Sequence, residues 1–288
     1  MYECVANVSE GRDEAVLGAL DAAAGDALLD RHSDADHHRS VFTLADPSIE
    51  VVSHAARSLA RAVAAAIDLT RHSGVHPRFG ALDVVPFVTL DPRPGAIAAT
   101  VEHARGFAAW AASELGIPAF LYDLADPLGR DLPTTRRDAF TDRAPDMTPD
   151  AERTRLGAVA VGARDPLVAV NVELERGDLE LARAVARAVR ARNGGLPGVR
   201  SLAFPLPSSG RVQVSMNLVD LDATGLEAAC GAVRSRVEAR GGAVHRIELV
   251  GLIPASELPR CSKEFRLAND LGPAATVEGR WEARGRPR

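Results

Sequence analysis

The sequence is poor in cysteine, in lysine and in long apolar runs. Its three cysteines, Cys4, Cys230 and Cys261, are far apart and form no CxxC pair, which argues against a disulfide framework or a zinc finger and favours a reducing compartment. Lys263 is the single lysine; together with abundant alanine this indicates compositional bias, and we attach no function to it. Since no apolar stretch reaches the roughly 18 residues of a membrane span, and the N-terminus lacks the pattern of a signal peptide, we expect a cytoplasmic protein without a membrane partner.

Composition and charge narrow the class further. The 288 residues are 46% hydrophobic and 25% charged, which is typical of a folded chain of one large domain or two small ones. The net charge of −5 at pH 7 argues against duplex nucleic acid as a partner, because such proteins normally carry a basic face.

Short apolar runs alternate with amphipathic, alanine-rich segments, a pattern typical of a layered α+β fold. Ser9 follows the first apolar run and is expected to cap the first helix. The pattern predicts strands over 2–8, 27–30, 40–45 and 81–90, helices over 13–24 and 47–67, and then a helix over 94–115 and a strand over 117–124. The first six elements have the order β-α-β-β-α-β, which is the ferredoxin-like split βαβ arrangement.

A second series with the same order begins at Leu167. We therefore predict two ferredoxin-like β-α-β-β-α-β subdomains, over residues 1–164 and 165–270. A tail over 271–288 is expected to fray from Gly279. Between the elements of the first subdomain, residues 126–156 are rich in Pro, Asp, Arg and Thr; a connection of this length predicts a functional loop or lid.

Five of the eight histidines fall in two loops. The first loop contains His32, His37 and His38, and the second contains His72 and His76. Imidazoles near neutral pH suit general acid–base chemistry. Three carboxylates near them in sequence are candidates for tuning their charge: Asp34, Asp36 and Asp83.

The first loop allows three interpretations. It fits best an anion or substrate site with Arg39 as a planar donor, and it also fits a solvated polar turn. A metal site is the third interpretation, because Asp and His are metal ligands, but the spacing matches no standard motif.

The second loop resembles a metalloprotease motif only in its histidine spacing. Gly74 and Pro77 exclude the helix that such a motif needs. His76 precedes Pro77, which favours extended backbone, and Arg78 is then close enough to bind a carboxylate. The alternative is a capped surface turn before the next strand.

Two long segments and three short ones form a larger pattern. The long ones are ECVANVSEGR over 3–12 and HSGVHPRFGALDVVPF over 72–87; the short ones are GAVAVGAR over 157–164, QVSMNLVD over 213–220 and LVGLIP over 249–254. Together they resemble the formiminotransferase family, the glutamate formimidoyltransferases, whose members carry ECVPNFSEGR and HKGEHPRMGALDVCPF in the first two places. The resemblance spans about residues 2–254 and implies a ligand cleft between the two subdomains.

The resemblance implies an enzyme that transfers a formimidoyl group from N-formimidoyl-L-glutamate to N5 of tetrahydrofolate, without a metal ion and as a homodimer. Tetrahydrofolate is then a co-substrate. His76 is the implied catalytic residue, which moves protons between the two nitrogens. The implied substrate- and folate-binding residues are Asn7, Asp36, His38, Arg39, His72, Arg78, Pro149 and Gly157.

The sequence also departs from the family pattern. Val75 replaces a glutamate, His38 replaces the asparagine of an NRT motif, and His32 stands where animal members carry aspartate. Within the folate-binding stretch only Pro149 and Gly157 match, and no segment resembles the cyclodeaminase domain of the animal enzyme.

Three alternatives stay open, the first of them favoured by the loss of the glutamate at Val75. One is a related formimidoyl or formyl transfer, and another is a non-catalytic folate- or partner-binding paralogue. The third is a metal-dependent hydrolase that would use His32, Asp34, His37 and His76.

Overall fold

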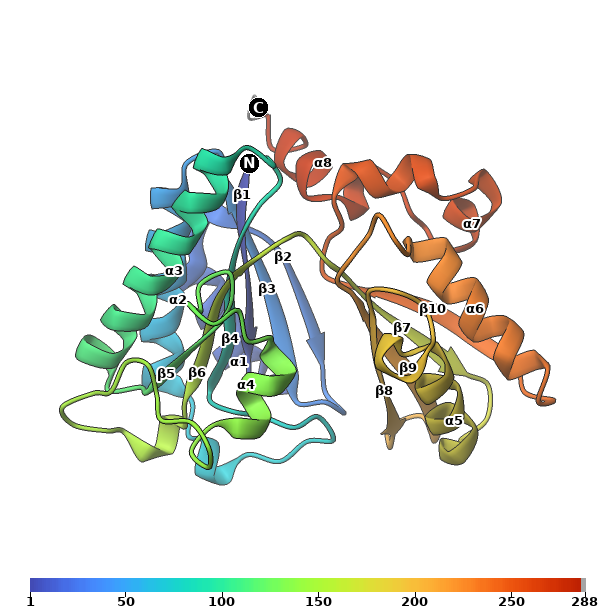
Figure 1. The fold of residues 1–288 in the computed structure, drawn as a ribbon, viewed down its shortest axis with the longest axis horizontal. Coiled ribbons are helices and arrows are strands. Elements are labelled where there is room, and N and C mark those ends of the chain that lie inside the picture. Colours follow the sequence, from blue (N-terminus) through green and yellow to red (C-terminus); the bar gives the residue numbers. More distant parts are fainter. Residues whose placement is uncertain (286–288) are drawn as a thin grey trace. The chain divides into compact units, whose positions relative to one another are not determined.

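The computed structural model describes residues 1–285, which form two compact units that divide after Arg164. Each unit has its own sheet and its own helices (Figure 1). Within residues 1–285, no helix is both long and apolar enough to cross a membrane.

The first unit contains one mixed sheet of six strands. Its elements are β1 (Tyr2–Val8), α1 (Glu14–Ala24), β2 (Leu28–Asp34), β3 (Arg39–Asp46), α2 (Ile49–Ala66), β4 (Leu82–Thr89), α3 (Pro94–Leu115), β5 (Ala119–Asp123), α4 (Leu132–Asp138) and β6 (Val159–Arg164). The strand order is β2-β3-β1-β4-β6-β5. β1 pairs antiparallel with β3 and β4, whereas β6 pairs parallel with β4 and β5. The first four strands therefore form the predicted split βαβ arrangement, which β6 and β5 extend.

The second unit repeats the arrangement with four strands. Its elements are β7 (Val168–Leu174), α5 (Leu179–Val189), β8 (Val199–Leu206), β9 (Arg211–Leu218), α6 (Leu226–Glu238), β10 (Val244–Val250), α7 (Lys263–Ala268) and α8 (Val277–Glu282). The strand order is β10-β7-β9-β8 and every pairing is antiparallel. The two-subdomain α+β fold class is thus confirmed.

Each sheet buries one face under its own helices. In α2, buried residues recur at three- and four-residue intervals from Ile49 to Ala64, and α2 and α3 pack side by side on the first sheet (Figure 1). In the second unit, alternate residues of β7 from Val168 to Leu174 join one core with α5 and α6. This alternation is what period-two strand geometry requires of a sheet covered on one face.

β4 is the central element of the first unit. All eight of its residues are buried. Val85 and Phe87 point into the main core, whereas Val84 packs on the opposite face with Tyr122 and with Leu132 of α4. The polar Asp83 at the start of β4 also has no exposed surface.

Two segments that the sequence suggested to be irregular are more ordered than expected. The connection over 126–156 contains the helix α4, and the buried side chain of Arg143 stabilises it by donating to the carbonyl of Leu121 at 2.9 Å and to Asp146 at 2.5 Å. The predicted fraying from Gly279 is contradicted by α8, in which Trp281 is only 4% exposed. Residues 286–288 lie outside the described part of the chain.

Candidate active site

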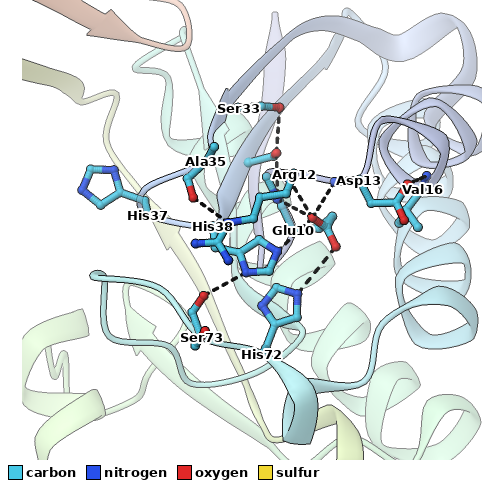
Figure 2. A network of polar contacts seen from close by, with 12 residues as sticks. Glu10, Arg12, Asp13, Val16, Ser33, Ala35, His37, His38, His72 and Ser73 are labelled. Carbon is cyan, nitrogen blue, oxygen red and sulfur yellow. Dashed lines mark hydrogen bonds and ion pairs between the residues drawn. The ribbon is translucent and has the colours of Figure 1, made fainter. Parts of the chain in front are cut away.

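Four segments meet at one edge of the first sheet. β1 and β2 end at this edge, and β3 and β4 begin there, because β1 runs antiparallel to β3 and β4. β2 extends to Asp34, so His32 lies in a strand and the predicted first loop shortens to residues 35–38. His72, which follows α2, reaches the same edge, and the close-up shows His72 and His38 turned toward Glu10, whereas His37 points away (Figure 2).

The two histidine loops contact each other, as their sequence positions predicted. The backbone N–H of Val75 donates to the carbonyl of Asp36 at 3.2 Å. The rings of His37 and His76 meet edge-on, with centroids 5.9 Å apart. The Arg78 guanidinium joins the loops by donating to the carbonyl of His37 at 3.2 Å.

A hydrogen bond to the backbone defines the tautomer of His76. Its Nδ1 donates to the carbonyl of Pro77 at 2.6 Å, since a carbonyl oxygen only accepts. In the neutral ring Nε2 therefore keeps its lone pair. Burial, then the positive charges of Arg39 and Arg136, lower the pKa of His76 from 6.5 to about 3, so the side chain is a neutral base at physiological pH.

Asp83 organises the positive charge beside His76. Its Oδ2 accepts hydrogen bonds from both Arg39 and Arg136, and its Oδ1 accepts the backbone N–H of Phe79 at 2.6 Å. Burial alone would raise the pKa of Asp83, but the two arginines outweigh it and the pKa lies far below its ordinary value. Asp83 therefore pairs directly with arginines, and its charge also raises the pKa of His76, as expected of a carboxylate that tunes the imidazoles.

Arg136 is a site residue that the sequence did not reveal. It lies in α4, inside the connection that has no periodic pattern, and its Nη1 also approaches the carbonyl of Pro77 at 3.5 Å. No motif marks it, and its neighbour Arg137, 66% exposed in its side chain, binds Asp138 instead.

Asn7 and Arg39 form a second fixed pair. The Asn7 Oδ1 accepts from Arg39 Nε at 3.1 Å and from Nη2 at 2.8 Å. With Nη1 on Asp83, all three Arg39 nitrogens have partners within the protein. The geometry gives Asn7 the role of orienting Arg39.

Glu10 is the second site residue that the analysis of the sequence missed. Its Oε1 accepts the backbone N–H groups of Gly11 and Arg12 at 2.8 Å and of Asp13 at 3.1 Å, and it lies 3.0 Å from Nε2 of His38. Burial would raise the pKa of Glu10, but these backbone donors and the charge of His38 lower it from 4.5 to about 2.

The depressed pKa of Glu10 makes a prediction about stability in acid. The charged form of Glu10 is favoured in the folded protein. Its contribution to the free energy of unfolding is therefore complete above pH 4.5 and is lost as the pH falls toward 2. The full shift corresponds to about 3 kcal/mol. We expect urea unfolding to show a stability difference between the protein and its Glu10→Gln variant that shrinks as the pH falls from 5 to 3. A difference that stays constant over that range would contradict this.

His38 and His72 complete a cluster around Glu10. Their rings stack with centroids 3.7 Å apart and an angle of 17° between planes, and His72 Nε2 lies 3.6 Å from Glu10 Oε2. Burial, followed by the charge of His38, lowers the pKa of His72. Among residues 1–285 these three side chains are the group whose spacing is compatible with a metal ion, with ligand atoms within 4.8 Å of one another; it differs from the hydrolase set considered from the sequence.

The remaining predicted residues lie along the 126–158 connection and its junction with β4. Gly157 has a φ of 66°, and a Cβ there would lie 2.6 Å from the carbonyl oxygen of Phe79, so the position requires glycine. It pairs in a bridge with Gly80, just before β4. Pro149 lies earlier in the connection and is half-buried.

Two ferredoxin-like units, the first with a sheet edge that gathers imidazoles, arginines and buried carboxylates, define a two-subdomain α+β protein that carries the groups used in acid–base catalysis. The family models identify the particular class. The model of the formiminotransferase domain, N-terminal subdomain, matches residues 1–164, and that of the formiminotransferase domain matches residues 169–271. The chain belongs to the formiminotransferase family, which confirms the resemblance.

Curated relatives match nearly the whole chain. It is 35% identical over 299 residues to the glutamate formimidoyltransferase of Thermoplasma acidophilum, covering 98% of this chain and 97% of that protein. The identity to the glutamate formimidoyltransferase of Streptococcus pyogenes serotype M1 is also 35%, over 94% of this chain and 95% of the relative. The formimidoyltransferase-cyclodeaminase of Sus scrofa is 34% identical over 90% of this chain, which spans 51% of that longer protein.

Proposed function

We propose that this protein transfers the formimidoyl group of N-formimidoyl-L-glutamate to N5 of tetrahydrofolate, giving 5-formimidoyltetrahydrofolate and glutamate. The observation that carries the proposal is the similarity, over 98% and 94% of the chain, to two glutamate formimidoyltransferases. The arrangement of His76 beside Arg39 and Arg136 supports it, because the reaction needs a base and a region that accepts an anionic substrate.

The chemistry assigns His76 two proton transfers. N5 of the folate attacks the amidine carbon, a C–N bond forms, and Nε2 of His76 takes the proton from N5. The same proton then goes to the amino nitrogen of the departing glutamate as the second C–N bond breaks. A substrate carboxylate near Arg39 and Arg136 would offset their charge and raise the pKa of His76 from about 3 toward the range in which it can also act as an acid.

The other predicted residues take supporting roles in this proposal. Arg39 and Arg78 supply the positive charge that attracts substrate carboxylates, while Pro149 and Gly157 contribute to the folate side. The remaining predicted binding residues line the substrate pocket: Asn7, Asp36, His38 and His72. No metal ion is needed in the transfer, since an amidinium carbon is already electrophilic. We further propose that the protein acts in the cytoplasm as a homodimer. Light scattering of the purified protein would test the dimer.

A direct transfer assay tests the function. Tetrahydrofolate is offered with N-formimidoyl derivatives of glutamate, aspartate and glycine, and 5-formimidoyltetrahydrofolate is measured as product. The glutamate derivative should give the highest kcat/KM. Transfer only from another donor would instead favour the related transferase that Val75 leaves open, and no transfer from any donor would favour a non-catalytic paralogue.

A folate ligand is expected to stabilise the protein. If tetrahydrofolate or folinic acid binds only the folded state, a concentration about 100-fold above its Kd adds about 2.7 kcal/mol to the free energy of unfolding. Thermal unfolding across a wide range of folate concentrations measures this. An unchanged melting temperature throughout would contradict a folate site.

A further inference from the structure

Glu10 is the point at which three separate segments are joined. It follows β1, and its Oε1 is fixed by three backbone N–H groups at the turn into α1. From this fixed position it reaches His38 of the β2–β3 turn and His72 of the segment after α2 (Figure 2). The three side chains are only about a tenth exposed: Glu10 10%, His38 11% and His72 8%.

The hydrogen bonds of His38 determine where its protons are. Nδ1 faces the carbonyl oxygen of Ser73 at 2.9 Å, and Nε2 faces the Glu10 carboxylate at 3.0 Å. Both partners are acceptors, so both ring nitrogens must carry hydrogen. His38 is therefore held as an imidazolium that pairs with a carboxylate.

The hydrogen bonds of His72 determine the opposite state. Arg78 has no acceptor, so its Nη1 donates to Nδ1 of His72 at 2.7 Å. His72 is then neutral, with its hydrogen on Nε2, which lies on the side of Glu10. Arg78 also contacts the carbonyl of His76 at 3.4 Å, so the orientation of His72 is linked to the position of the catalytic loop.

The same geometry disfavours a metal ion in the cluster. An imidazole binds a metal through a lone pair in the plane of its ring, at about 2.0–2.1 Å for zinc. Two nearly parallel rings whose centroids are 3.7 Å apart cannot both hold one ion in their planes. The Arg78 hydrogen bond also places a proton on the nitrogen of His72 that would have to bind the ion.

We propose that Glu10 is a positioning residue that holds His38 as an imidazolium and, through the stacked His72 and Arg78, fixes the loop that carries His76, without a metal ion. The effect on turnover rests on the proposed function, whereas the protonation states do not.

The experiment combines ring chemical shifts, metal content and kinetics. In the unaltered protein, ¹⁵N spectra of the histidine rings should show both nitrogens of His38 protonated near pH 7 and His72 with hydrogen on Nε2; His38→Asn and His72→Gln variants assign the signals. In Glu10→Gln the His38 signals should become those of a neutral ring. A neutral His38 in the unaltered protein would overturn the proposal without any assay of activity.

Kinetics and metal content complete the test. Glu10→Gln should lower kcat by about 10- to 100-fold, the cost of a misplaced catalytic group, with KM changed only a few-fold. Glu14→Gln is the matched control, because that side chain is 76% exposed and contacts Arg31; its kcat should stay unchanged. One equivalent of bound metal that disappears in Glu10→Gln, or a Glu10→Gln variant with normal kcat, would overturn the proposal. If the protein has no transfer activity at all, the ring chemical shifts and the metal content still test whether Glu10 holds His38 as an imidazolium without a metal ion.

Discussion

Replacing His76 with alanine is expected to lower kcat by about 10²–10⁴-fold and to change KM only a few-fold. The reason is that an acid–base group stabilises the transition state, whereas ground-state binding depends on the arginines that face the substrate. His76 has the required form, because Nδ1 is used by the carbonyl of Pro77 and Nε2 keeps its lone pair in the neutral ring. Steady-state kinetics of the formimidoyl transfer measure both constants.

Two comparisons make the His76 result interpretable. His54→Ala is the matched control, since His54 is exposed on α2 and should leave kcat unchanged. His32→Ala and His38→Asn test the first histidine segment. If His76→Ala keeps near-normal turnover while either of these is inactive, the base belongs to that segment and our assignment is wrong.

The sequence predicted the elements of the fold well because the periodic pattern is strong. The apolar run over 81–90 became β4, in which every residue is buried, and the β-α-β-β-α-β order appears in both units. Local capping was less predictable: Ser9 was expected to cap α1, yet its hydroxyl donates to the carbonyl of Gly80 at 2.8 Å, and Asp13 caps the helix. Competition between a local cap and a distant backbone partner is decided by tertiary structure.

The convergence of the two histidine loops was predictable, because sheet topology brings the ends of β1 and β2 and the starts of β3 and β4 to one edge. The hydrogen-bond and ion-pair partners of each side chain were not predictable. Asp83 was a candidate for tuning the charge of the histidines, and its charge does raise the pKa of His76, but the sequence did not indicate that its direct partners are Arg39 and Arg136. Arg136 comes from an aperiodic connection, where no pattern indicates which of several arginines turns inward.

The departures from the family pattern acquire a physical meaning in the structure. Val75 contributes its backbone N–H to Asp36, a contact that does not depend on the side chain, so the loop keeps its connection without the glutamate. His38 pairs with Glu10 through a charged hydrogen bond. Both changes make the site more positive, one by removing a carboxylate and the other by adding an imidazolium, which favours an anionic substrate.

The largest expected effect on stability comes from Asp83→Asn. Asparagine keeps the size of the side chain and can still accept the N–H of Phe79, but it removes the charge that two arginines share. Arg39, with 13% of its side chain exposed, is then a buried cation without its carboxylate. Breaking such a pair costs about 3–5 kcal/mol, which equilibrium urea unfolding measures.

The control and a double variant separate charge from packing. Asp222→Asn removes a carboxylate that is fully exposed and should change stability by less than about 0.5 kcal/mol. Arg39→Gln combined with Asp83→Asn removes the carboxylate together with one of its two cationic partners. It should cost less than the sum of the single variants, because Arg136 alone, rather than both arginines, is left without its carboxylate. A strictly additive double variant would show that Asp83 contributes through packing alone. The non-additive result would instead establish that the charge balance among Asp83, Arg39 and Arg136 stabilises the edge of the sheet on which His76 depends.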